Sequence, residues 1–136
     1  FSLHDALPIS TPQDIALIDA RRAVAMFEKV NVPVLGLVEN MAVHICSQCG
    51  HADHIFGVEG GKKMAGELGI DYLGALPLSR AIREQADSGQ PTVVADPDGS
   101  EAASDKGGAG QVAVRIAARA KDFSSKFPTI TVSQDT

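Results

Sequence analysis

The chain has 136 residues, enough for one domain or a large piece of one. Apolar residues make up 44% of the chain and charged residues 21%, which is typical of a globular protein, and no run of about 18 apolar residues predicts a membrane span. The formal net charge of −5 argues against a nucleic-acid-binding surface, because phosphate neutralisation requires an excess of Lys and Arg, and the lack of a secretory-signal pattern leads us to expect a cytoplasmic protein.

The first predicted elements are a helix and a buried strand. The helix begins at "STPQD", where Thr11 is expected to cap it and Pro12 to occupy its first position, and it ends near Asn31. Its predicted apolar face comprises Leu17, Ala20, Val24 and Phe27. The strand is "VPVLGLVEN", residues 32–40, whose almost continuous apolar character indicates burial on both faces of a parallel sheet. Among the first ten residues, only Leu7 to Ser10 could form the end of a strand.

Two more helices flank a second predicted strand. Residues 60–69 are predicted to form a helix that Gly69 ends. Residues 71–78, "DYLGALPL", form the strand, and residues 79–89 form a helix that Ser79 caps.

The C-terminal third is predicted to be less regular. Residues 91–97, "PTVVADP", indicate a short edge strand or an extended segment, and residues 96–110 indicate a surface loop. A final helix follows over residues 110–123, and residues 123–136 form a loose tail.

This order of elements predicts an α/β fold, a partial parallel sheet with flanking helices. Two complete strands are too few to support four helices, so we expect the C-terminal part of a larger domain. Ligands of such sheets bind at the carboxyl ends of the strands, which here are residues 36–49 and 74–84.

The stretch "HICSQCGHADHIFG", residues 44–57, holds the only two cysteines of the chain, Cys46 and Cys49. Thiolates at this spacing in a loop can both bind one metal. Zinc would need two further ligands, which could come from His44, His51 and His54. A four-iron cluster takes four thiolates, so two chains would be needed, which predicts a homodimer with the cluster at its interface. A redox disulfide and a pair of inert thiols are the other two interpretations.

Two residues at strand ends are candidates for contacts with a nucleotide base. The side-chain amide of Asn40 can accept from and donate to an adenine ring, although an asparagine in a turn is the commoner explanation. Pro77 lies where backbone groups could flank a base, or it serves only to end its strand.

The segment "GVEGGKKMAGELG", residues 57–69, is rich in Gly and Lys but is not a phosphate loop, because its spacing is wrong and no Ser or Thr follows Lys63. We expect instead a helix N-terminus near the cysteines, with its amides available to a charged cluster; the glycines could equally serve tight packing.

These motifs together resemble the Mrp/ApbC family of iron–sulfur cluster carrier ATPases. The resemblance covers residues 10–98 and rests on "TPQD", "FEKVNVPVLGLVENM", the Cys-x-x-Cys loop and "IRE…DSGQP". It implies a MinD/ParA-like P-loop NTPase fold and a homodimer that holds a bridging 4Fe–4S cluster through Cys46 and Cys49. It also implies that Asn40 and Pro77 contact the adenine of ATP, and that the protein passes its cluster to apo-protein clients.

The resemblance has limits that set further expectations. The phosphate loop and the magnesium-binding segments of the family do not occur in the 136 residues, so we assign no catalytic residue and expect no ATP hydrolysis by this chain alone; ATP and Mg²⁺ belong to a full-length parent. Residues 1–9 do not match the family strand and could be an artefact. Residues 10–122 are expected to form the C-terminal part of the NTPase domain.

Overall fold

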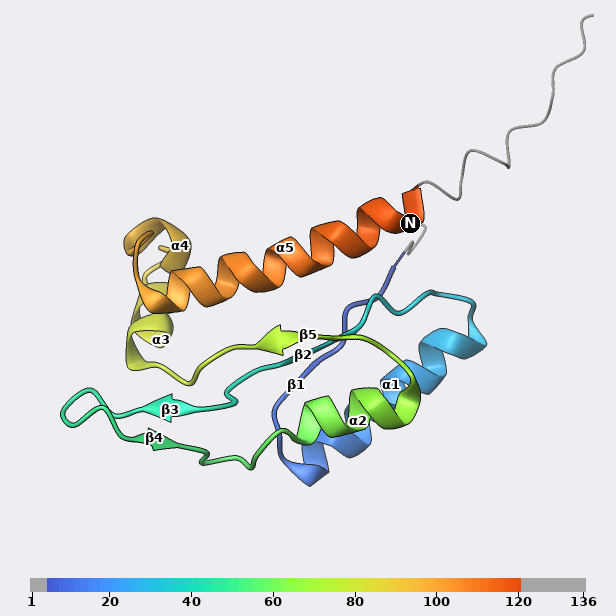
Figure 1. The fold of residues 1–136 in the computed structure, drawn as a ribbon, viewed down its shortest axis with the longest axis horizontal. Coiled ribbons are helices and arrows are strands. Elements are labelled where there is room, and N and C mark those ends of the chain that lie inside the picture. Colours follow the sequence, from blue (N-terminus) through green and yellow to red (C-terminus); the bar gives the residue numbers. More distant parts are fainter. Residues whose placement is uncertain (1–4, 121–136) are drawn as a thin grey trace, which may run out of the picture.

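The structure, a computed structural model, describes residues 5–120 and confirms the α/β fold (Figure 1). The strands are β1 (Ile9–Ser10), β2 (Leu37–Glu39), β3 (His44–Ile45), β4 (Ala52–Asp53) and β5 (Tyr72–Ala75). The helices are α1 (Asp14–Lys29), α2 (Gly60–Leu68), α3 (Arg80–Asp87), α4 (Thr92–Ala95) and α5 (Ser100–Ala120). The predicted tail and the predicted end of the last helix lie outside the described residues.

A parallel sheet forms the middle layer of the molecule. Its strand order is β1–β2–β5, with Ile9 paired to Val38 and Ser10 to Glu39. The predictions of strands within residues 32–40 and 71–78, and of a strand end within residues 7–10, are therefore confirmed. Helices α1 and α2 lie on one face of the sheet and α5 lies on the other (Figure 1).

Two apolar clusters fill the space between these layers. Successive residues of β2 point to opposite faces of the sheet, so that Leu37 packs on the α2 side and Val38 on the α5 side. The α2 side comprises Leu37, Met64 and Ala65, with Leu17, Ala20, Leu68, Ile70 and Tyr72 packed against them. The α5 side comprises Leu35, Val38 and Leu73, with Leu7, Leu76 and Val112 packed against them.

Helix α1 presents its predicted face but begins later than predicted. Val24, at the centre of that face, is buried. The predicted cap was wrong: Gln13 is the N-cap, Pro12 lies before the helix, and the Thr11 hydroxyl donates to Gln13 Oε1 at 3.1 Å. Pro12 approaches Gly60 so closely that a Cβ on this glycine would lie 2.5 Å from the Pro12 carbonyl oxygen, and this packing holds Pro12 outside the helix.

The structure at residues 91–97 also differs from the prediction. These residues hold the short helix α4 and not an extended segment. The carbonyl of Pro91 accepts hydrogen bonds from the amides of Val94 and Ala95, at 2.8 and 3.0 Å, so that the proline starts a helical turn. The β-branched residues after the proline favoured an extended segment, and a run this short has too few residues for its periodicity to indicate a helical turn instead.

The predicted loop over residues 96–110 was wrong for most of its length, because α5 begins at Ser100. Four glycines made this stretch look irregular, and the three that lie within α5, Gly107, Gly108 and Gly110, each cost about 1 kcal/mol relative to alanine in a helix. Packing on both sides of these glycines offsets that cost, since Ala102 is completely buried and Val112 contacts the α5-side cluster. The helix predicted from residue 110 is confirmed as far as Ala120. Neither α5 nor any other helix within residues 5–120 is long and apolar enough to cross a membrane.

Candidate metal-cluster site

The two cysteines lie at the tip of a hairpin that projects from the carboxyl edge of the sheet (Figure 1). Strands β3 and β4 pair antiparallel, and the amide of Cys46 donates to the His51 carbonyl at 2.9 Å. The Gly50 amide then closes the turn by donating to the Cys46 carbonyl at 2.8 Å. Cys46 is half-buried and Cys49 is exposed, and neither is in a disulfide. The predicted loop over residues 44–57 is thus a short hairpin that holds both thiols on one accessible turn.

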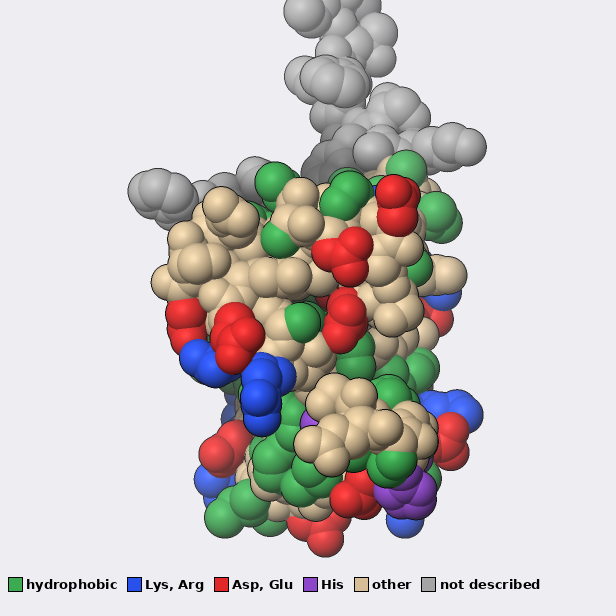
Figure 2. Space-filling view, turned by 90° about the vertical axis from the view of Figure 1, so that its left-hand side faces the viewer, with side chains coloured by type: hydrophobic (Ala, Val, Ile, Leu, Met, Phe, Trp, Pro, Cys, Tyr) green, Lys and Arg blue, Asp and Glu red, His purple; other side chains and the backbone are tan. Residues whose placement is uncertain are grey.

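The hairpin end of the molecule also exposes apolar side chains. Ile45, Ile55 and Val58 are each more than half exposed. In the view toward this end, hydrophobic side chains gather over the lower part of the surface, beside histidine (Figure 2). The thiols therefore stand on an accessible surface of mixed character and not in a closed cavity.

The turn stabilises the thiolate form of Cys46. Hydrogen bonds from the backbone of Gln48 and then of Cys49 lower the pKa of the Cys46 thiol, as does a further bond from the Cys49 thiol. Desolvation opposes these bonds, and the electrostatic interaction with His44 adds to them. A thiolate is the form of cysteine that binds metals, so this environment suits a ligand.

Two histidines that the zinc hypothesis uses as ligands, His44 and His54, contact backbone carbonyls instead. Nδ1 of His44 lies 3.0 Å from the Leu78 carbonyl oxygen, and Nδ1 of His54 lies 2.9 Å from the Ala42 carbonyl oxygen. Across residues 5–120, no three His, Cys, Asp or Glu side chains come together in a way that could hold a metal ion. Cys46 and Cys49 are therefore not joined by a histidine within the described part of one chain.

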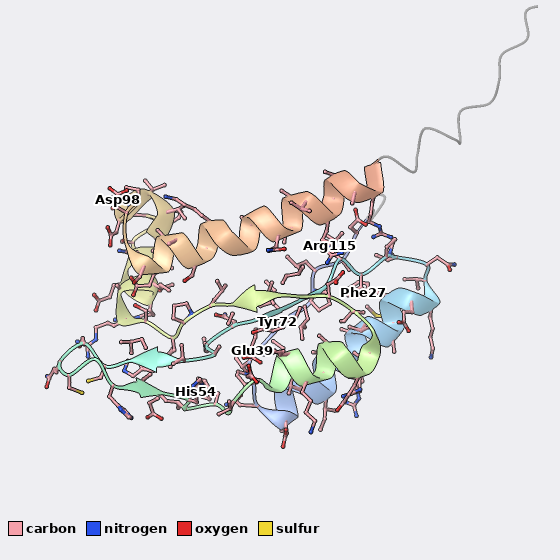
Figure 3. All side chains as sticks on the ribbon, in the orientation of Figure 1. Phe27, Glu39, His54, Tyr72, Asp98 and Arg115 are labelled. Atoms are coloured by element: carbon pink, nitrogen blue, oxygen red, sulfur yellow. The ribbon has the colours of Figure 1, made fainter. Side chains whose placement is uncertain are left out.

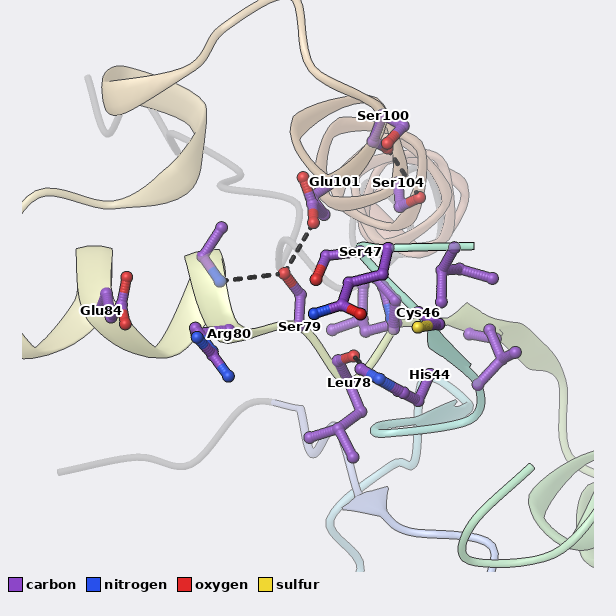
Figure 4. A pocket seen from close by; sticks show the side chains of 17 residues that line it. His44, Cys46, Ser47, Leu78, Ser79, Arg80, Glu84, Ser100, Glu101 and Ser104 are labelled. Carbon is purple, nitrogen blue, oxygen red and sulfur yellow. Dashed lines mark hydrogen bonds between the residues drawn. The ribbon is translucent and has the colours of Figure 1, made fainter. Parts of the chain in front are cut away.

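A pocket of about 870 Å³ opens between the hairpin, the segment after β5 and the start of α5 (Figure 4). Cys46 lines one wall and Pro77 lines another. The Ser79 hydroxyl accepts from the Ala81 amide at 3.2 Å, which confirms the predicted cap of α3, and donates to Glu101 at 2.7 Å. The pocket thus brings one predicted thiol ligand and one predicted adenine contact into the same space.

Asn40 is not among the residues that line this pocket. Its backbone amide donates to the Ser10 carbonyl at 2.7 Å, which continues the pairing of β1 with β2. Its side-chain oxygen accepts from the amide of Met41 at 2.9 Å, in a turn where Met41 has a φ of 57°. The turn role considered for Asn40 is therefore present, and the adenine role stays a prediction.

Glu39 is a residue that sequence reasoning missed. It is 2% exposed at the carboxyl end of β2, on the same face as Leu37, and its carboxylate accepts from the Gly61 amide at 2.5 Å (Figure 3). Of the amides at the start of α2 that were expected to be available to a cluster, that of Gly61 is occupied by this carboxylate. The sequence did offer a signal for this contact: Glu39 is an acidic residue within a strand predicted to be buried, and a buried carboxylate requires a hydrogen-bond donor.

The comparisons with known proteins fit this arrangement. A family model described as "ParA: NUBPL iron-transfer P-loop NTPase" matches residues 1–113. An iron-sulfur cluster carrier protein of Pseudomonas fragi is 63% identical over 90 residues, which cover 66% of this chain and 31% of that protein. The chain spans 25% to 31% of the length of the curated relatives compared with it.

Two solved structures share the fold. A nucleotide-binding protein of Archaeoglobus fulgidus, in complex with ADP, has a TM-score of 0.57 and 28% identity, over 71% of this chain and 38% of that one. The cell division ATPase MinD of Pyrococcus furiosus has a TM-score of 0.61 and 22% identity, over 85% of this chain and 43% of that one. These likenesses confirm the predicted MinD/ParA-like fold.

Proposed function

The chain belongs to the ParA/NUBPL family of iron-transfer P-loop NTPases, and from this premise we propose that it carries an iron–sulfur cluster on the Cys46–Cys49 turn. The cluster is cargo, received from a donor and passed to apo-protein clients. The observation that carries the proposal is the turn itself, which presents two thiols together and lowers the pKa of Cys46.

We propose further that the cargo is a 4Fe–4S cluster that bridges two copies of the chain. Such a cluster takes four thiolates, and the whole chain has two. An exposed turn at the tip of a projecting hairpin can meet its symmetric copy without displacing any core residue. The second copy would supply the other two sulfurs.

Control of this carrier by ATP is proposed for the full-length parent. The adenine contacts are assigned to Asn40 and to the segment of Pro77, at the carboxyl edge of the sheet, where α/β folds bind nucleotides. The support is the ADP complex of the Archaeoglobus relative and the position of both residues at strand ends. A role in hydrolysis is not assigned to any residue of this chain.

Anaerobic reconstitution with iron and sulfide tests the cluster. We expect roughly four irons for every two chains, a visible absorption band, and a dimer by analytical ultracentrifugation only when iron is bound. Cys46→Ser and Cys49→Ser should each remove the band and the dimer, whereas the matched variant His51→Ala, on the same hairpin, should retain both. Stoichiometric zinc that depends on His51 or His54 would contradict the proposal.

A further inference from the structure

The cysteine hairpin is attached to the rest of the fold by two histidine side chains. Strands β3 and β4 have two residues each, and a hairpin of that length is marginally stable by itself. The His44 and His54 side chains each reach a backbone carbonyl outside the hairpin, at 3.0 and 2.9 Å. His44 is the first residue of β3 and His54 directly follows β4, so the two contacts lie at the bases of the two arms of the hairpin.

The tie at His44 is reinforced by the backbone. The amide of Leu78 donates to the Val43 carbonyl at 2.8 Å, and His44 pairs with Leu78 as a parallel bridge. Figure 4 shows the His44 ring beside the Leu78 carbonyl at the wall of the pocket. Leu78 is therefore held through both its N–H and its C=O by two consecutive residues that lead into Cys46.

A carbonyl only accepts hydrogen bonds, so Nδ1 of each histidine must carry the proton in these contacts. Nε2 of each ring then takes no part in the tie. The tie formed by His44 or His54 therefore depends on the N–H group at Nδ1. Metal binding through Nε2 would depend on the other ring nitrogen, so substitutions can distinguish the two roles.

The carbonyls that accept these bonds belong to the segments that carry the predicted adenine contacts. Leu78 directly follows Pro77, and Ala42 lies two residues after Asn40. The two segments are also joined to each other, because the Ala42 amide donates to the Leu76 carbonyl at 3.0 Å. A displacement of either segment therefore acts on the hairpin through a side chain whose bond is short and directional.

We propose that His44 and His54 are positioning residues that make the geometry of the Cys46–Cys49 turn follow the position of these segments. The inference rests on the proposed function, since it assigns the turn's position a role in binding and releasing a cluster. In the full-length parent, the same ties would transmit a shift at the nucleotide edge to the sulfurs without any contact between nucleotide and cluster.

The first test measures alkylation of the two thiols in the cluster-free chain, where no other thiol reacts. Asn places an amide N–H near the position of Nδ1, whereas Gln extends it by one methylene toward that of Nε2. At an alkaline pH where both thiols are ionised, so that losing the effect of His44 on the Cys46 pKa does not change the rate, we expect His44→Ala and His44→Gln to accelerate alkylation about fivefold, the effect of losing one net hydrogen bond. His44→Asn should stay within about twofold of the unsubstituted chain. His51→Ala, an exposed histidine of the same hairpin, is the matched control and should leave the rate unchanged.

Amide hydrogen exchange reports on the fold in the same samples. Exchange at Leu78 should accelerate in His44→Ala, while exchange at the core residues Leu37 and Leu73 should not. If His44→Ala fails to fold, the Asn and Gln variants decide the matter, since they differ only in where the N–H lies. The inference would be overturned if His44→Gln were alkylated as slowly as the unsubstituted chain, or if His44→Asn were alkylated as fast as His44→Ala.

The second test asks whether the hairpin follows the Pro77 segment. Pro77→Gly loosens that segment and should accelerate alkylation when it is introduced into the unsubstituted chain. Introduced into His44→Ala, it should accelerate alkylation little further, because the His44–Leu78 hydrogen bond is already absent. Strictly multiplicative effects of the two substitutions would contradict the coupling. Both tests use cluster-free protein. A failure of iron reconstitution would therefore refute the proposed function without affecting the alkylation results, and the two proposals can fail separately.

Discussion

Two regions at the carboxyl end of β2 differ in burial and in role: the junction of Glu39 with the start of α2, and the cysteine hairpin. The junction of Glu39 with the start of α2 is buried, and a carboxylate, an amide and a glycine without room for a side chain fit together there. The cysteine hairpin, only a few residues away in sequence, is exposed and has two-residue strands. The junction holds the fold together, whereas the hairpin presents a reactive turn that the fold merely carries.

The difference teaches where a carrier can place its ligands. In the function proposed above, the sulfurs meet a second chain and then give up their cargo, and a sulfur with that role has to be accessible, so it cannot share in the core. Its position must nevertheless be defined, and here hydrogen bonds to backbone carbonyls supply what packing does not. Substitutions at the junction should therefore affect stability, and those at the hairpin tip should affect function alone.

The largest effect on stability is expected from Gly61→Ala at the junction. The new Cβ would lie 2.8 Å from Glu39 Oε2 and 3.3 Å from a methyl of Leu37, and neither side chain is free to move because both are buried. Overpacking of this kind costs about 1–3 kcal/mol of the free energy of unfolding, which chemical denaturation can measure.

Gly66→Ala is the matched control, since Gly66 lies in the same helix with open space where its Cβ would be. It should stabilise the protein by about 0.5–1 kcal/mol, because alanine is the better helix former. If both glycine variants changed stability in the same direction, the proposed close packing at the junction would be wrong.

A smaller effect is expected from Tyr72, the only tyrosine of the chain, on the core side of the same region (Figure 3). Burial first, and then the negative charges of Glu39 and Glu59, raise the pKa of Tyr72 to about 12. Because the unfolded phenol has a lower pKa, near 10, the folded state holds its proton more tightly. The resulting stability is fully present below about pH 10 and is lost as the pH rises through 12.

The near-ultraviolet absorbance of tyrosinate measures this titration directly, because the chain has no tryptophan. Tyr72→Phe should remove this part of the alkaline loss of stability and leave the hairpin thiols unaffected at neutral pH. Titration of the folded protein at the ordinary tyrosine pKa would show that the Glu39 region is more open to water than the structure indicates.

Local sequence signals predicted the elements that short-range chemistry determines. Gly69 ends α2 with a left-handed φ of 65°, and Ser79 caps α3, as expected. The Cys-x-x-Cys spacing predicted that both thiols lie on one loop, and the structure places them on the turn of a hairpin. These features depend on a few neighbouring residues, so a single sequence is sufficient to find them.

The contacts that position the site were not predictable in this way. His44 and Leu78 are 34 residues apart, and Glu39 and Gly61 are 22 apart. Each depends on strand register and on helix placement, which no local pattern specifies. The first half of α5, residues 100–109, was predicted as loop for a related reason, since its glycines are tolerated through tertiary packing, in which Ala102 is buried and Val112 packs against the α5-side cluster.

The smallest effect on stability is expected where the effect on function is largest. Replacing both thiols, Cys46→Ser and Cys49→Ser, leaves the backbone bonds of the turn in place and exposes no apolar surface, so the free energy of unfolding of the cluster-free chain should change by less than about 0.5 kcal/mol. The same variant should bind no iron on reconstitution. Denaturation curves that shift by more than 1–2 kcal/mol, a size typical of buried groups, would mean that the hairpin is part of the core and would remove the contrast between the two segments.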